Sequence, residues 1–263
     1  MLSCSYSHRK RPCSTAAATA DWAALPPDIL FTVFLKLGQH DIFCGADSVC
    51  TSWRRIALGE PALWRHVDMT KVLLCSMRRL AIILQKNMNR SAGQCESFSG
   101  GIRCDQSMLT YVVQRAPSLK SLCLLDYRHR INVVGAIKKL PLLECLKVAF
   151  FEPACFEKTF QSVCEACPRL KKLSLRHICL PWAYRNKENI EIHGGPLKYP
   201  IPVMHELRSL RLIFYGFTEK KLVAIIDSCP VLEYLHIAPC ISDEKVQELQ
   251  ARYARLKIVS AHY

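Results

Sequence analysis

The residues with the clearest potential for chemistry are cysteines near the middle of the chain. Cys164 and Cys167 form a C-x-x-C pair, and His177 and Cys179 follow closely. Thiolates and imidazoles at such spacing are typical zinc ligands, so one interpretation is a metal site. The other is packing, because the pair falls in a predicted helical turn and no second C-x-x-C follows. The sequence favours packing, and we predict no metal and no cofactor.

The histidines do not indicate a catalytic centre. His8, His40, His66, His129 and His193 lie on unrelated segments. The sequence has no nucleophile elbow, phosphate-binding loop or paired-carboxylate signature. We therefore expect a binding protein without catalytic residues of its own, rather than an enzyme.

Composition indicates the compartment. The chain has 263 residues, half of them hydrophobic, a formal net charge of +14 and 15 cysteines. No secretory segment precedes the cysteines, so we expect free, mostly buried thiols in the nucleus and/or cytoplasm. No apolar run is long enough to cross a membrane. Residues 1–20 are polar and small and are expected to form a disordered tail, with an organellar transit peptide as the alternative.

The elements that position these residues repeat along the chain from about residue 94. Segments such as PSLKSLCL (117–124) and PRLKKLSL (168–175) share one template, and a degraded copy lies at 254–261. The leading leucines are Leu119, Leu143, Leu170, Leu207, Leu232 and Leu256. Their intervals are 24, 27, 37, 25 and 24 residues, and all but the third lie in the range of leucine-rich repeats. The third interval contains a Pro-, Gly- and charge-rich segment, 181–202, which we interpret as an inserted loop.

Each repeat also has a helical half. Residues 218–229 and 242–254 begin with Thr218 and Ser242, which are suitable N-caps, and carry apolar residues at helical spacing. A single unit of helix, turn and short strand cannot bury its own apolar face, but a stack of such units shares a core. The sequence therefore predicts an α/β solenoid of short parallel strands alternating with helices, about six repeats within residues 69–263.

Strand alternation predicts which side chains could hold a partner. The template leucines point into the core, so the residues between them form the concave face. Candidate binding residues there are Lys147, Lys172, Arg176, Arg211, Tyr234 and His236. This face carries no acid, so it suits an acidic or phosphorylated segment of a protein. The alternative is a solvated face on a basic chain.

Residues 25–64 are an apolar-rich helical module ahead of the repeats. Pro26, Pro27 and Asp28 suit the start of a helix, and Gly38 ends it. About forty residues rarely bury so many large apolar groups alone, so another surface is expected to cover them. That surface is either the rest of the chain or a separate protein.

The module closely resembles the F-box. The family pattern is met by Leu25-Pro26, Asp28, an apolar helix, Val49-Cys50, Trp53-Arg54 and Leu63-Trp64. The resemblance implies a three-helix module at 21–68 that binds the Skp-type adaptor of a cullin–RING ubiquitin ligase. The contacts it implies are Leu25, Pro26, Ile29, Leu30, Val33, Phe34, Leu37, Ile42, Val49, Cys50 and Trp53. One departure is Gly45 with Asp47 in the second helix, where glycine costs about 1 kcal/mol relative to alanine.

Together the two parts resemble plant-type F-box/leucine-rich-repeat proteins over residues 21–263. Cys229-Pro230 with Cys240 fits their cysteine-containing repeat subclass, which implies a right-handed solenoid. The implied role is substrate receptor of an SCF-type E3 ubiquitin ligase, linked through the adaptor to cullin and RING subunits. The alternative is a protein-interaction or basic nucleic-acid-binding protein outside the ligase. Nucleic acid is disfavoured because the basic residues are not gathered with stacking aromatics.

Overall fold

The structure is a computed structural model of the chain. It describes residues 21–72, 76–125, 131–150, 156–177, 200–213, 218–238 and 242–260. The expected tail at 1–20 and residues 181–199 of the expected insertion lie outside the described residues.

Helices and strands alternate after an all-helical start. The α-helices are α1 (Pro27–Lys36), α2 (Gln39–Cys44), α3 (Thr51–Gly59), α4 (Met77–Arg90), α5 (Gln106–Arg115), α6 (Val133–Ile137), α7 (Phe156–Ala166), α9 (Glu219–Asp227) and α10 (Asp243–Arg252). The strands are β1 (His66–Asp68), β2 (Ser97–Gly100), β3 (Ser121–Leu125), β4 (Cys145–Phe150), β5 (Lys172–His177), β6 (Ser209–Ile213), β7 (Tyr234–Ile237) and β8 (Lys257–Ser260). Short 3₁₀ turns lie at Trp22–Ala24, Ala46–Ser48 and Pro61–Trp64.

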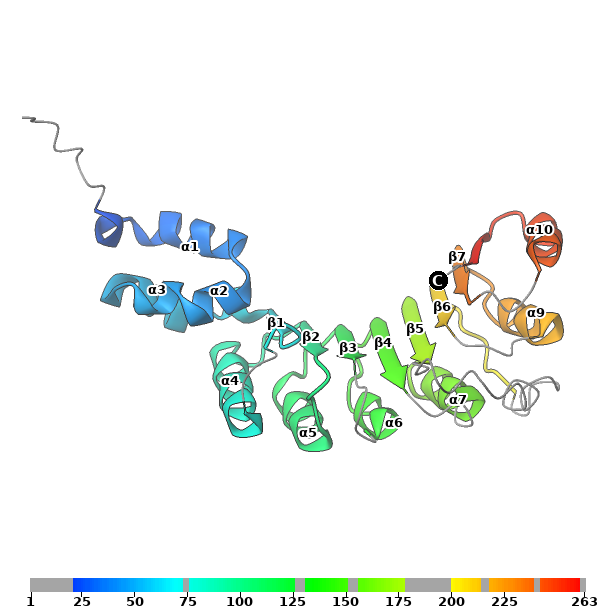
Figure 1. Cartoon of the computed structure of the whole chain (residues 1–263), viewed down its shortest axis with the longest axis horizontal. Coiled ribbons are helices and arrows are strands. Elements are labelled where there is room, and N and C mark those ends of the chain that lie inside the picture. Colours follow the sequence, from blue (N-terminus) through cyan, green and yellow to red (C-terminus); the bar gives the residue numbers. More distant parts are fainter. Residues whose placement is uncertain are drawn as a thin grey trace, which may run out of the picture.

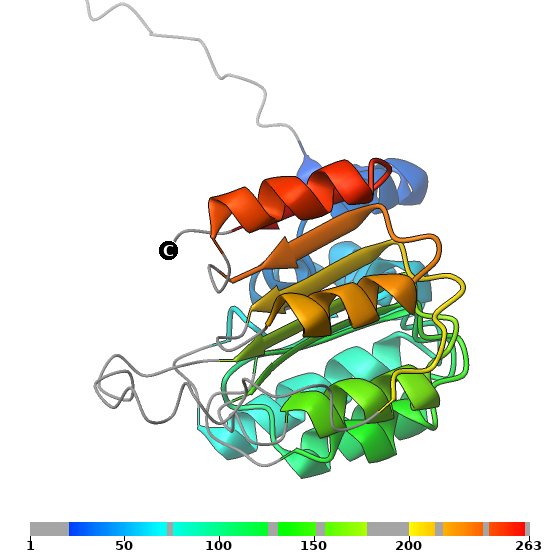
Figure 2. The same ribbon diagram turned by 90° about the vertical axis from the view of Figure 1, so that its right-hand side faces the viewer.

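The described strands form one sheet in the order β1 to β8, and each neighbouring pair is parallel. Figure 1 shows the strands on the inner side of an arc with α4 to α7 on its outer side, and the helices α1 to α3 at one end. The turned view in Figure 2 shows successive strands lying alongside one another, with the helices stacked beside them. The predicted α/β solenoid of parallel strands and helices is confirmed.

The predicted leucines build the solenoid core. All six leading leucines are at most 2% exposed. In β3 the side chains alternate between buried and half-buried, so Leu122 and Leu124 face the helices while Ser121 and Cys123 face the inner side of the arc. Because each repeat repeats this alternation, one continuous core runs along the sheet.

The sheet has two strands that the leucine template missed. The register pairs β1 with β2 and β2 with β3, so Trp64 and Cys95 stand where later repeats have their leading leucine. Both side chains are fully buried. The solenoid therefore begins at the last residue of the F-box-like motif, and β1 lies inside the range that the sequence assigned to the helical module.

The helical module has its own small core. Leu30, Phe34, Ile42 and Trp64 are buried together with Ala46, Ala57 and Leu63. Helix α1 begins at Pro27 with Asp28 in its first turn, as the sequence predicts. Helix α2 ends at Cys44, directly before Gly45, and the chain continues as a 3₁₀ turn.

A buried cation joins this module to the solenoid. Arg90 at the end of α4 donates a hydrogen bond of 2.8 Å from Nη2 to Oδ2 of Asp47, and both side chains are about nine-tenths buried. The guanidinium also lies 4.7 Å from the ring centre of Trp64 and 5.4 Å from that of Phe43. Asp47, which is part of the departure from the family pattern, therefore has a structural role at the junction.

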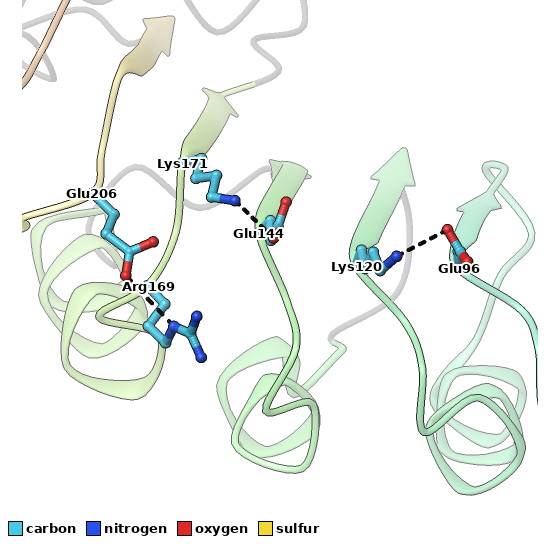
Figure 3. A network of polar contacts seen from close by, with 6 residues as sticks. All are labelled: Glu96, Lys120, Glu144, Arg169, Lys171 and Glu206. Carbon is cyan, nitrogen blue, oxygen red and sulfur yellow. Dashed lines mark hydrogen bonds and ion pairs between the residues drawn. The ribbon is translucent and has the colours of Figure 1, made fainter.

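Ion pairs connect neighbouring repeats where each chain segment enters its strand. Figure 3 shows Lys120 paired with Glu96 (3.2 Å), Lys171 with Glu144 (2.8 Å) and Arg169 with Glu206 (3.5 Å). Arg208 pairs in the same way with Glu233. The hydrogen bond from Lys171 holds the pKa of the Glu144 carboxyl below its usual value. Each exposed pair contributes less than about 1 kcal/mol.

The sheet is continuous across the long third interval. Strand β5 pairs directly with β6, although residues 178–199 between them are not described. On the helical side, Nζ of Lys221 in α9 lies 2.6 Å from Oε1 of Glu157 in α7. Lys221 is only 3% exposed, so this pair fixes the two helices against each other inside the solenoid.

Within the described ranges, no single helix is long and apolar enough to cross a membrane. The segments Pro27–Lys36 and Gln39–Ser48 meet the test of length and composition only as a pair, bent by 120°.

Candidate functional site

The helical module leaves large apolar side chains in contact with solvent. Among the predicted adaptor contacts, Ile29 is 48% exposed, Val33 38%, Leu37 37% and Val49 58%. We refer to these four as the docking residues. Ile29 and Val33 lie one turn apart on α1, so they form a stripe on the same face of that helix. Exposed apolar residues grouped in this way are typical of protein–protein contact surfaces.

Three predicted contacts lie elsewhere. Leu30, Phe34 and Ile42 are at most 1% exposed and fill the core of the module. In this structure these three side chains pack the helices of the module against one another and offer no surface of their own.

The remaining predicted contacts support the start of the module. The indole of Trp53 donates a hydrogen bond of 2.9 Å to the carbonyl oxygen of Trp22 and packs edge-on against Phe34, with ring centres 5.5 Å apart. This fixes the turn that precedes α1. Leu25 is half-buried and Pro26 is exposed.

Cys50 has a distinctive thiol. It occupies the N-cap position of α3, and its Sγ lies 3.0 Å from Oγ of Ser52. The hydrogen bond with Ser52 and a second from the backbone N–H of Trp53 lower the pKa of this thiol. Cysteines in the solenoid core differ in this respect, because burial raises the pKa of their thiols.

The C-x-x-C pair lies in that core. Cys164 and Cys167 are buried, and burial raises the pKa of both thiols, that of Cys167 to about 11. Both side chains are part of the hydrophobic core of the solenoid, as the packing interpretation expects. No group of three or more potential ligands that could hold a metal occurs among the described residues, and Cys179 lies outside them.

The predicted target-binding residues share the inner face of the arc. The strand register places Lys147 of β4 beside Ser174, Ser174 beside Arg211, and Arg211 beside His236. A second row contains Lys172, Ser209 and Tyr234. Lys147, Lys172, Arg176, Arg211 and Tyr234 are exposed and His236 is half-buried. The structure thus brings all six side chains to one face of the sheet between β4 and β7.

The surroundings of His236 disfavour the charged form of its imidazole. Partial burial, followed by the nearby charges of Arg211 and Lys257, lowers its imidazole pKa. The neutral ring is therefore favoured at neutral pH, and Lys and Arg supply the positive charge.

Lys257 is an inner-face cation that the template missed. Counting from the leading Leu256 puts Lys257 one position before the strand, as in the earlier repeats. The register instead pairs Lys257 with Tyr234 on the inner face, because the last repeat is one residue shorter there. The poor match of residues 254–261 to the repeat template was the feature of the sequence that could have indicated this difference in length.

Comparisons with known proteins agree with this architecture. Residues 22–70 match the F-box-like family. The chain is 31% identical over 248 residues to "Putative F-box/LRR-repeat protein 21" of Arabidopsis thaliana, covering 88% of this chain and 78% of the relative. It is 32% identical over 234 residues to "Putative F-box/LRR-repeat protein 22" of the same plant, covering 85% and 70%. "F-box protein SKIP19", also from Arabidopsis thaliana, is 28% identical over 246 residues, covering 92% and 77%.

Proposed function

This chain belongs to the F-box/LRR-repeat family, and from that premise we propose that it is the substrate-recognition subunit of an SCF-type E3 ubiquitin ligase. The observation that carries the proposal is the coincidence of the F-box-like match at residues 22–70 with exposed apolar residues in that same segment. Proteins of this family are generally receptor or adaptor subunits rather than enzymes.

The docking residues support adaptor binding through the module. The core of the helical module and the core of the solenoid are each filled by their own buried side chains. Ile29, Val33, Leu37 and Val49 are thus left for an outside partner, which we propose is a Skp-type adaptor. These side chains are already about half-buried, so covering the rest of one would contribute at most about 1 kcal/mol to the complex.

The solenoid supports the second half of the proposal. Among the described elements, the helices α4 to α7 lie on the outer side of the sheet and not on its inner side (Figure 1), and curved solenoids present such inner faces to protein ligands. A target held there and a ligase held by the module would share one chain. Tethering raises the effective concentration of the target near the ubiquitin-loaded subunit, so the bond-forming chemistry belongs to other subunits.

The test is capture of a purified Skp-type adaptor by the full chain. We expect the double variant Ile29→Asp/Val33→Asp to bind at least about tenfold more weakly, because charged groups would be desolvated at the interface. The matched control is Ile82→Asp, which places the same acid at an exposed apolar position of α4, outside the module. Undiminished capture by the double variant, or equal loss in the control, would exclude the proposed docking mode.

A further inference from the structure

Charge is divided unevenly along the inner side of the solenoid. Strands β4 to β8 contain Lys147, Lys172, Arg176, Arg211 and Lys257, and no aspartate or glutamate. Strands β1 to β3 contain no lysine or arginine and one acid, Asp68. That carboxylate already accepts hydrogen bonds from the backbone N–H and the hydroxyl of Thr70. The positive field is therefore confined to the second half of the sheet.

Several cations elsewhere on the molecule have acidic partners. Lys120, Lys171 and Arg208 pair with glutamates where the chain enters the strands, and Lys245 of α10 pairs with Glu219. By contrast, four cations of the inner face have no ion-pair partner within the described residues. These inner-face cations are Lys147, Lys172, Arg211 and Lys257.

Their spacing is as informative as their charge. Lys147 and Arg211 lie in one row, each in register with Ser174 between them. Neighbouring strands are about 4.8 Å apart, so these two cations stand about 10 Å apart. A peptide in the extended polyproline II conformation advances about 3.1 Å per residue and has three residues per turn, so every third side chain lies on the same side and would meet the next cation. In the second row, Lys172 of β5 and Lys257 of β8 are three strands apart, which is about 14 Å.

We propose that the inner face of β4 to β8 binds an extended segment of a partner protein rich in aspartate and glutamate, with carboxylates about three residues apart, which crosses the strands. The proposal rests on the proposed function in one respect, namely that this partner is the ubiquitination target. Closely spaced carboxylates of the target would be what the receptor recognises.

Two competing ligands fit less well. A single phosphate needs several donors that converge on one point, whereas these cations lie on separate strands. Single-stranded nucleic acid needs exposed aromatic rings for stacking, and on strands β4 to β8 the exposed ring among the described side chains is that of Tyr234. Distributed carboxylates match the charge of this face and the spacing of Lys147 and Arg211.

The experiment measures binding of the full chain to a labelled peptide of about 12 residues with glutamate at every third position. A peptide with glutamine at those positions, a peptide with one phosphoserine and a single-stranded oligonucleotide serve as comparisons. We expect the glutamate peptide to bind most tightly, with affinity that falls as salt rises. The inner-face variant Lys147→Glu/Lys172→Glu/Arg211→Glu should weaken its binding at least about tenfold.

A matched variant changes net charge equally on the outer helices. Arg78→Glu/Lys158→Glu/Lys220→Glu replaces three exposed cations that lie in the first turns of α4, α7 and α9, where glutamate suits the helix dipole. It should bind the glutamate peptide like the wild type. Equal weakening in both variants, or tighter binding of the phosphoserine peptide or the oligonucleotide, would overturn the proposal. Adaptor capture is measured on the same samples, so loss of the ligase role is distinguished from loss of the acidic-segment site.

Discussion

A histidine within a positively charged face should make folding stability depend on pH. Burial, Arg211 and Lys257 lower the pKa of His236 in the folded chain, whereas in the unfolded chain it returns to about 6.5. Between these two values the unfolded chain binds a proton that the folded chain does not. The contribution of neutral His236 to the free energy of unfolding is therefore fully present above about pH 6.5. It is lost as pH falls from there through the lower pKa of the folded chain.

The measurement is urea unfolding at pH 7.5 and at pH 5.5. The stability of the wild type relative to His236→Gln should decrease on going to the lower pH, since glutamine does not titrate. Arg211→Gln removes one neighbouring charge, so it should make this loss of stability at the lower pH smaller. A relative stability that rises on acidification would contradict the assigned direction.

At the level of single residues, the sequence predicted the inner face better than the docking face. Strand alternation assigns each side chain to one side, and all six predicted inner-face residues lie where they were expected. Helix α1 is apolar on most of its circumference, so spacing alone could not separate Leu30 and Phe34, which are buried, from Ile29 and Val33, which are exposed. That distinction depends on where α3 packs.

Among the elements, α4 is expected to anchor the helical module through one residue. Arg90→Ala leaves Asp47 as a nearly buried carboxylate without its cation and removes the packing over Trp64. We expect a loss of about 3 kcal/mol in the free energy of unfolding, measured by urea titration. Asp47→Ala should cost a similar amount, and the double variant less than the sum, because the two residues share one interaction.

The matched control for this prediction is the exposed pair of Lys120 and Glu96. Its side chains are 50% and 33% exposed, so solvent screens the interaction and Lys120→Ala should cost at most about 1 kcal/mol. A cost for Arg90→Ala no larger than that of Lys120→Ala would show that the junction is held by other contacts.

Element recognition from sequence failed where residue types deviated from the template. Strands β1 and β2 were not predicted because Trp64 and Cys95 replace the leading leucines, although both side chains fill the same buried position. The later repeats were recognised because leucine recurs at that position. A template that accepts any buried side chain of suitable shape would have found β1 and β2, but would also match many unrelated segments.

At the scale of the whole molecule, the helical module and the solenoid are fused without a linker. Trp64 belongs to the core of the module and donates a hydrogen bond of 2.9 Å to the carbonyl oxygen of Ala57 in α3. By register it also occupies the first position of the solenoid, and Arg90 of α4 covers its ring. A receptor built in this way would hold its target at a fixed orientation relative to the ligase.

This fusion predicts how a change at the junction spreads. Trp64→Ala should cost about 3–5 kcal/mol and accelerate amide hydrogen exchange on both sides of the junction, in α1 to α3 and in β1 and α4. Leu30→Ala, which opens a cavity in the module one helix away from the solenoid, should accelerate exchange mainly in α1 to α3. Exchange is followed by mass spectrometry of peptides from each region at equal denaturant. If Trp64→Ala left β1 and α4 as protected as Leu30→Ala does, the two parts would be separately stable, and the fixed orientation would have to come from the pair of Arg90 and Asp47 alone.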